Sequence, residues 1–220
     1  MAQVDFQHRE IIVKLVYYGP ALSGKTTNLQ QVHGRLDPRR RGRLVTLDTK
    51  DDRTLYFDLL PLAVRSTSGS TVKLKLFTVP GQVIHNNTRK VVLQGVDAVA
   101  FIADSQLRET RANNESFANL QQNLRDNGIA EEDIPIVIQF NKRDLPEIRT
   151  EEELHRLASR GKERVFPAVA CRGEGVTETL LGLVDATYDS LERKVGLGSK
   201  HGFPKEELLA GLALQLGVVR

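Results

Sequence analysis

The sequence contains one cysteine, Cys171, and no tryptophan among its 220 residues. A single cysteine excludes an intramolecular disulfide, and no group of cysteines and histidines has the spacing of a zinc site. Long hydrophobic runs are also missing, because no stretch approaches the roughly 20 apolar residues that span a bilayer. The polar N-terminus lacks the pattern of a secretory signal. These absences predict a reduced, cytoplasmic chain with no stable membrane anchor.

An excess of one charge sign is missing as well. The chain has 31 lysines and arginines against 28 aspartates and glutamates, which gives a formal net charge of +3. A nearly balanced charge offers no argument for a nucleic-acid partner. The hydrophobic pattern alternates between short β-branched runs and longer helical stretches. This alternation predicts an α/β fold, with helices on both faces of a sheet.

The pattern also places the individual elements. Strands are predicted over residues 11–18, 44–47, 59–65, 72–79, 96–103, 134–140 and 165–170. Helices are predicted over residues 25–35, 105–127 and 176–194, with one more that opens at Thr150 through a capping box. Asp104 or Ser105 is the expected N-cap of the helix over 105–127, and Gly128 its stop.

Two regions are expected: a main domain over residues 1–195 and an extension over residues 196–220. The extension starts with a glycine-rich linker and continues into a predicted helix over 204–219. The helix carries an apolar stripe, and two glycines weaken it by about 1 kcal/mol each relative to alanine. The sequence leaves open whether this helix packs on its own domain, binds a partner or touches a membrane. The stripe consists of Leu208, Leu212, Leu216 and Val219.

Residues 19–26, GPALSGKT, match the phosphate-loop pattern G-x-x-x-x-G-K-[ST]. The match follows a predicted strand and opens a predicted helix, which is the context that the motif requires; the alternative is a glycine turn that only joins strand to helix. Glycines let backbone N–H groups curl around phosphate oxygens, and the helix N-terminus adds positive potential. Lys25 is expected to neutralise the β- and γ-phosphates, and the Thr26 hydroxyl to bind Mg²⁺. The predicted nucleotide contacts in this segment are Gly19, Ala21, Leu22, Ser23, Gly24, Lys25, Thr26 and Thr27.

Asn141-Lys142-Arg143-Asp144 follows a buried strand, at the carboxyl end where open α/β sheets bind ligands. The Asp144 carboxylate matches the N1–H and 2-amine donors of guanine, whereas adenine would leave it unpaired. The Lys142 stem is expected to cover one face of the base. Asn141, Lys142 and Asp144 therefore predict GTP and GDP as ligands, against the alternative of an ordinary polar loop or an ATP-binding protein.

A third motif, Thr78-Val79-Pro80-Gly81-Gln82, ends the strand predicted over residues 72–79. Gly81 is expected to present its N–H to the γ-phosphate, and Gln82 to orient the attacking water. Thr54, in an irregular stretch after the first helix, is the predicted second hydroxyl on Mg²⁺. That loop would order with GTP and relax with GDP.

Together these motifs resemble the MglA-type small GTPases of bacteria, which control cell polarity and gliding or twitching motility. The resemblance covers residues 8–194 and implies a Ras-like P-loop NTPase fold: a mostly parallel sheet whose one antiparallel edge strand can slide on activation. It also implies slow GTP hydrolysis that a Roadblock-type homodimeric partner accelerates, polarity or motility effectors, and recruitment to a cell pole with GTP. The carrying segments are VYYGPALSGKTTNLQ, DRTLYFDLLPL, FTVPGQV, GVDAVAFIADSQ and IPIVIQFNKRDLP.

The resemblance also assigns roles to single residues. Arg53 matches the arginine with which members of the family stimulate GTP hydrolysis from their own chain. Such an arginine raises the hydrolysis rate by roughly 10³–10⁵. The alternative is a solvated loop arginine. Gln82, Arg53 and Lys25 form the expected catalytic set. Thr78 stands where most Ras-like proteins carry an aspartate that holds a water on Mg²⁺, so the loss weakens that tie. This replacement motivates an alternative function, a nucleotide-binding scaffold with little hydrolysis.

The segment after the last strand departs from the family pattern. Ala170 is still expected to give its backbone N–H to guanine O6. Cys171 is also a predicted nucleotide contact, beside the base, and we expect it to be a small packed residue rather than a reactive one.

Overall fold

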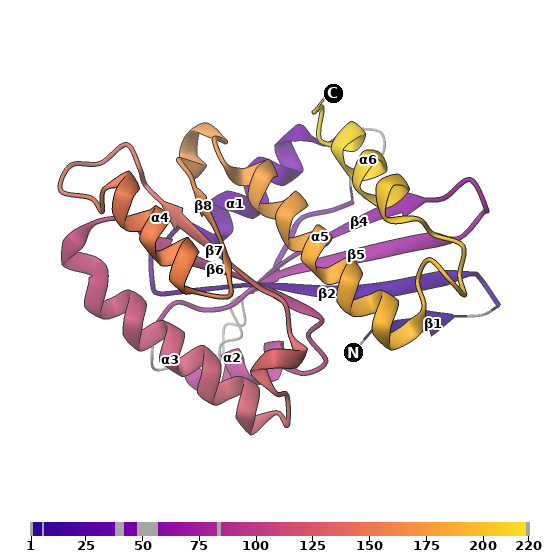
Figure 1. The fold of residues 1–220 in the computed structure, drawn as a ribbon, viewed down its shortest axis with the longest axis horizontal. Helices are drawn as coiled ribbons and strands as arrows, with labels where there is room; N and C mark the ends of the chain where they lie inside the picture. The colour runs from indigo at the N-terminus through magenta and orange to yellow at the C-terminus, as the bar shows by residue number, and fades with distance from the viewer. Residues whose placement is uncertain (1, 6, 38–41, 48–56, 83–84, 219–220) are drawn as a thin grey trace.

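The computed structural model describes residues 2–5, 7–37, 42–47, 57–82 and 85–218. They form an open twisted sheet with helices on both faces (Figure 1). The strands are β1 (Gln3–Asp5), β2 (Glu10–Tyr18), β3 (Val45–Leu47), β4 (Phe57–Arg65), β5 (Thr71–Thr78), β6 (Ala98–Asp104), β7 (Ile136–Asn141) and β8 (Arg164–Pro167). The helices are α1 (Lys25–Arg35), α2 (Asn86–Leu93), α3 (Thr110–Asp126), α4 (Glu151–Arg160), α5 (Val176–Val195) and α6 (Lys205–Gln215).

The strand order is β3-β4-β5-β2-β6-β7-β8, with β1 paired to β2 outside this path. The strands from β5 to β8 in this order run parallel to one another. β4 runs antiparallel to β5, and the short β3 pairs antiparallel on its outer side. The predicted mostly parallel Ras-like sheet is confirmed, but the antiparallel strand β4 is not at the edge as predicted, because the short β3 pairs outside it.

Alternation along β2 divides the core into two layers. Val13 and Leu15 belong to a cluster with α1 and α5, whereas Val16 and Tyr18 belong to a cluster with α2 and α3. Figure 1 shows the same division, with α1, α5 and α6 on one face of the sheet and α2 and α3 on the other. All seven residues of β6 are buried, as predicted for a strand that helices cover on both sides.

Several element boundaries differ from the predictions. The helix predicted over 105–127 begins at Thr110, because the Asp104 carboxylate accepts the N–H of Gln106 and a short 3₁₀ turn follows. The N-cap prediction at Asp104 or Ser105 is therefore wrong, whereas the stop at Gly128, where φ is 70°, is confirmed. The capping box at Thr150 is also present, with both of its hydrogen bonds. Helix α2 and strand β1 were not predicted.

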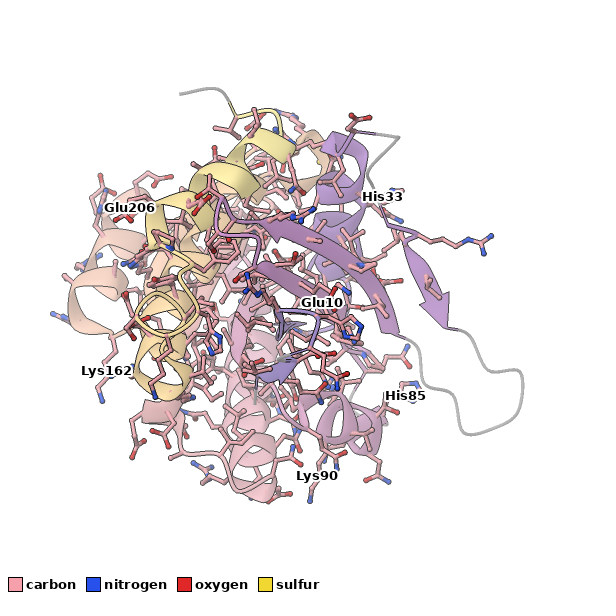
Figure 2. The ribbon with its side chains drawn as sticks, turned by 90° about the vertical axis from the view of Figure 1, so that its right-hand side faces the viewer. Glu10, His33, His85, Lys90, Lys162 and Glu206 are labelled. Atoms are coloured by element: carbon pink, nitrogen blue, oxygen red, sulfur yellow. The ribbon has the colours of Figure 1, made fainter. Side chains whose placement is uncertain are left out.

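The extension packs on its own domain. Leu208, Leu212 and Leu216 are buried in the same cluster as the residues of β4 and α5. The Gln215 side chain donates to the Ala63 carbonyl of β4 at 2.8 Å. Figure 2 places Glu206, on α6, away from Lys90 of α2 across the molecule. Within the described residues, no helix combines the length and apolar character needed to cross a membrane.

Gly211→Ala is expected to destabilise the protein, although alanine favours helices. A Cβ at this position would lie 2.5 Å from Cγ1 of Val64 on β4, so α6 would be pushed off the sheet. Overpacking of this kind costs about 1–3 kcal/mol, more than the roughly 1 kcal/mol gained from helix propensity. Urea unfolding measures the effect. Gly34→Ala on α1, where a Cβ meets nothing within 4 Å, is the control and should not destabilise; equal stabilisation by both substitutions would contradict the account.

Candidate nucleotide-binding site

The phosphate loop leaves β2 at Tyr18 and enters α1 at Lys25. Gly19 and Gly24 both have positive φ, at 145° and 101°. A Cβ on Gly19 would lie 2.2 Å from the carbonyl oxygen of Ile102, and one on Gly24 would lie 2.2 Å from the Asn141 amide nitrogen. The loop therefore follows the ends of β6 and β7 so closely that both positions require glycine.

Lys25 is buried, with 7% of its surface exposed. Its ammonium donates to the carbonyl oxygens of Gly19 at 3.0 Å and Pro20 at 2.6 Å. Burial, and secondarily the positive charge of Arg89, lowers the pKa of Lys25 to about 7. Because both acceptors are neutral, the charge has no carboxylate to compensate it in these contacts. A buried cation of this kind fits a phosphate group held by the loop.

A cavity of about 570 Å³ opens between the phosphate loop and strands β4 and β5. It brings together most of the predicted phosphate and metal contacts: Leu22, Gly24, Lys25, Thr26, Thr27 and Gly81. Gly81 lies directly against the loop, because a Cβ there would be 2.3 Å from Cα of Ala21. The same cavity is lined by Asp58 and Thr78. Gln82 follows Gly81 and is exposed.

Asp58 of β4 was missed by sequence reasoning. Its carboxylate oxygen Oδ2 accepts the Thr26 hydroxyl at 2.7 Å and the Thr78 hydroxyl at 3.1 Å. The Asp58 N–H donates to the Thr78 oxygen at 2.9 Å, and the residue is 4% exposed. Thr78 stands where most Ras-like proteins carry an aspartate, and here Asp58 places a carboxylate next to that position from the neighbouring strand. The only signal in the sequence is one acid in the otherwise acid-free strand Phe57–Arg65.

These oxygens fit magnesium, which prefers hard oxygen ligands. When Thr26 donates its proton to Asp58, the lone pairs of its hydroxyl oxygen stay available for a cation. Thr54, the predicted second hydroxyl, and Arg53 both lie outside the described residues, and their roles stay predictions.

At the predicted guanine end of the site, Asn141 forms hydrogen bonds to both the phosphate loop and the loop after β8. Its amide nitrogen donates to the Ser23 carbonyl at 2.8 Å, and its oxygen accepts the Ala170 N–H at 2.8 Å. The Ala170 N–H that was predicted to bind guanine O6 thus donates to Asn141 in this structure, and its contact with guanine stays a prediction. Cys171 is exposed, so the expectation of a packed side chain is also wrong.

Lys142 and Asp144 lie on the loop after β7. Lys142 has a positive φ of 64°, and its ammonium pairs at 2.5 Å with Asp104, a buried carboxylate at the end of β6. This pair, which sequence reasoning did not find, fixes the Lys142 stem beside the base site. The Asp144 side chain is 20% exposed and lies 3.6 Å from the Arg172 guanidinium.

Comparison with known proteins gives two findings. The model of the ADP-ribosylation factor family matches residues 3–187. The mutual gliding-motility protein MglA of Myxococcus xanthus (strain DK1622) is 43% identical over 193 residues, which cover 88% of this chain and 99% of that protein.

Proposed function

We propose that this chain is a switch that binds GTP or GDP together with Mg²⁺. It hydrolyses GTP slowly alone and faster with a partner. The chain belongs to the ADP-ribosylation factor family and is an MglA-type small GTPase. The observation that carries the proposal is the buried Lys25 ammonium, whose acceptors among the described residues are two carbonyls and which lines a cavity together with Asp58, Thr78 and Gly81.

Each predicted site residue has a role in this proposal, whether or not it lines the cavity. The loop amides and Lys25 bind the phosphates, and the Gly81 N–H meets the γ-phosphate only when GTP is present. Thr26 and Thr54 would hold the magnesium ion, and Asp58 would orient the Thr26 hydroxyl toward it; when bound, the ion would neutralise charge on the β- and γ-phosphates. Gln82 orients the attacking water, Arg53 stabilises the charge that develops, and Asp144 selects guanine.

A titration with labelled GDP and GTP, with and without Mg²⁺ and with ATP as competitor, tests this proposal. We expect magnesium-dependent binding of both guanine nucleotides and no displacement by ATP. Slow phosphate release that a Roadblock-type homodimer accelerates would support the switch over a scaffold with little hydrolysis. Failure to bind either guanine nucleotide would refute the proposal.

The relative's name points to gliding motility, and we extend that process to this chain as control of cell polarity or surface motility through effectors that bind the GTP form. We propose a cytoplasmic protein that is recruited to a cell pole with GTP. A fluorescent fusion in the host should be diffuse with GDP-locked variants and polar when hydrolysis is blocked; a nucleotide-independent distribution would contradict this.

Asp58→Asn is expected to weaken magnesium binding to the nucleotide complex by about 10–100-fold, the usual cost of losing a group that orients a metal ligand. The measurement is the rate of labelled GDP release against free Mg²⁺. Thr78→Asp alone should also be harmful, because it puts two carboxylates in contact. The double variant Asp58→Asn/Thr78→Asp should recover most of the magnesium dependence. If the GDP release rate of Asp58→Asn depends on free Mg²⁺ as in the wild type, Asp58 has no role in magnesium binding.

A further inference from the structure

Arg89 of α2 is an arginine in a core position. Only 2% of its surface is exposed, and it is among the largest fully buried side chains of the described residues. Its Nε donates to the Pro80 carbonyl at 2.8 Å, and one terminal nitrogen donates to the Gly81 carbonyl. The other terminal nitrogen donates to the Asn119 side chain at 2.9 Å. These acceptors, the ones found among the described residues, are all neutral, and burying a cation without a carboxylate partner is costly.

The two carbonyls that Arg89 binds belong to the peptides on either side of Gly81. In a planar trans peptide the C=O and N–H groups point in opposite directions. A guanidinium on the Pro80 carbonyl therefore turns the Gly81 N–H away from Arg89. The second hydrogen bond, to the Gly81 carbonyl, fixes the peptide that leads into Gln82. Arg89 thus sets the orientation of both peptide planes at the glycine that closes against the phosphate loop.

A network behind the guanidinium holds it in place. The Arg89 guanidinium lies 5.6 Å from the ring centroid of Tyr18, the last residue of β2 before the phosphate loop. The Tyr18 hydroxyl donates to the Asn119 oxygen at 2.5 Å, and Asn123 donates to that hydroxyl at 3.0 Å. Asn119 and Asn123 also both donate to Asn86. The Arg89 guanidinium therefore contacts residues of both β2 and α3, and these contacts restrict its orientation.

We propose that Arg89 is a positioning residue for the terminal phosphate, because it aims the Gly81 N–H and the start of the Gln82 backbone at the γ-phosphate position. This inference rests on the proposed GTP function. It separates two nucleotides: GDP lacks the γ-phosphate, so only GTP depends on the orientation of Gly81. A residue that merely stabilises the fold would affect both nucleotides alike.

The test uses the full chain, with Arg89→Lys as the main variant and Arg89→Ala as the second. Lysine keeps the charge but not the planar fork that joins two carbonyls and Asn119. The affinities for GDP and for the slowly hydrolysed analogue GTPγS are measured in Mg²⁺, together with single-turnover hydrolysis of GTP. The control is Arg111→Ala on α3, whose side chain is 90% exposed and pairs only locally with Glu115.

For Arg89→Lys we expect GTPγS affinity to fall about 10-fold, the effect of losing one hydrogen bond to a charged group. GDP affinity should stay within about threefold, hydrolysis should slow, and the control should match the wild type. Equal loss for both nucleotides would show a structural role, and no loss for either would show no role; both outcomes overturn the proposal. If Arg89→Ala does not fold, Arg89→Lys still decides. Wild-type protein that binds neither nucleotide would instead overturn the proposed function.

Discussion

Asp144→Asn is expected to lower the affinity for GDP by about 10³-fold and to make xanthosine diphosphate the preferred ligand. In the proposed complex the carboxylate accepts two donors from guanine, the N1–H and the 2-amine. An asparagine keeps one acceptor but sets an N–H₂ group against the 2-amine, so two donors oppose each other. A lost charge-assisted hydrogen bond and an unpaired donor together cost about 4 kcal/mol, which corresponds to about 10³-fold.

Xanthine carries a carbonyl where guanine carries the amine, so the asparagine N–H₂ finds an acceptor there. Competition between labelled GDP and labelled xanthosine diphosphate measures the reversal. Asp126→Asn, an exposed aspartate on α3 that pairs with Lys90, is the matched control and should keep the guanosine preference. A variant that loses both nucleotides equally would show that Asp144 supports the loop rather than the choice of base.

Arg53→Ala is expected to lower the partner-stimulated rate of GTP hydrolysis by about 10³-fold or more, because an arginine that meets the transition-state charge is worth 10³–10⁵. Gln82→Leu removes the group that we propose to orient the attacking water, and it should also abolish most of the stimulated rate. Both variants should bind GTP normally, since neither contact is needed in the ground state.

Single-turnover phosphate release, with and without a Roadblock-type partner, measures these rates. Arg111→Ala and Gln121→Leu, both on α3, are the controls for charge and for side-chain type. If hydrolysis is unchanged in both site variants, the assigned roles are wrong. If GTP binding is lost along with hydrolysis, the residues act in binding instead.

Helix α1 and the strands of the parallel sheet could be predicted because their signals are local. The phosphate-loop motif fixes the start of α1 at Lys25, and apolar runs mark β6 and β7. Helix α2 was missed for the opposite reason. Its sequence NNTRKVVL is polar on the face where Arg89 is buried, and that burial depends on tertiary contacts, among them those to Pro80, Gly81 and Asn119.

The proposed magnesium site depends on the register of β4 against β5, and this register cannot be predicted from the sequence pattern. β4 pairs with β5 so that Leu59 opposes Phe77, and this register sets Asp58 beside Thr78. A shift of one residue would turn the carboxylate to the other face of the sheet. The hydrogen bond from the Ala170 N–H to Asn141 could not be predicted for a similar reason, because it depends on how closely β7 approaches the last loop.

The packing of α6 on β4 has a practical consequence for anyone who purifies this protein. β4 carries Asp58 near its first residue and meets Gly211 and Gln215 of α6 through Val64 and Ala63 near its last. A fragment limited to residues 1–195 lacks α6 and would expose the apolar surface of β4 around Ala63 and Val64. The same strand carries Asp58 of the proposed magnesium site. Such a fragment is prone to self-association, and its nucleotide exchange rates should not be read as those of the intact chain.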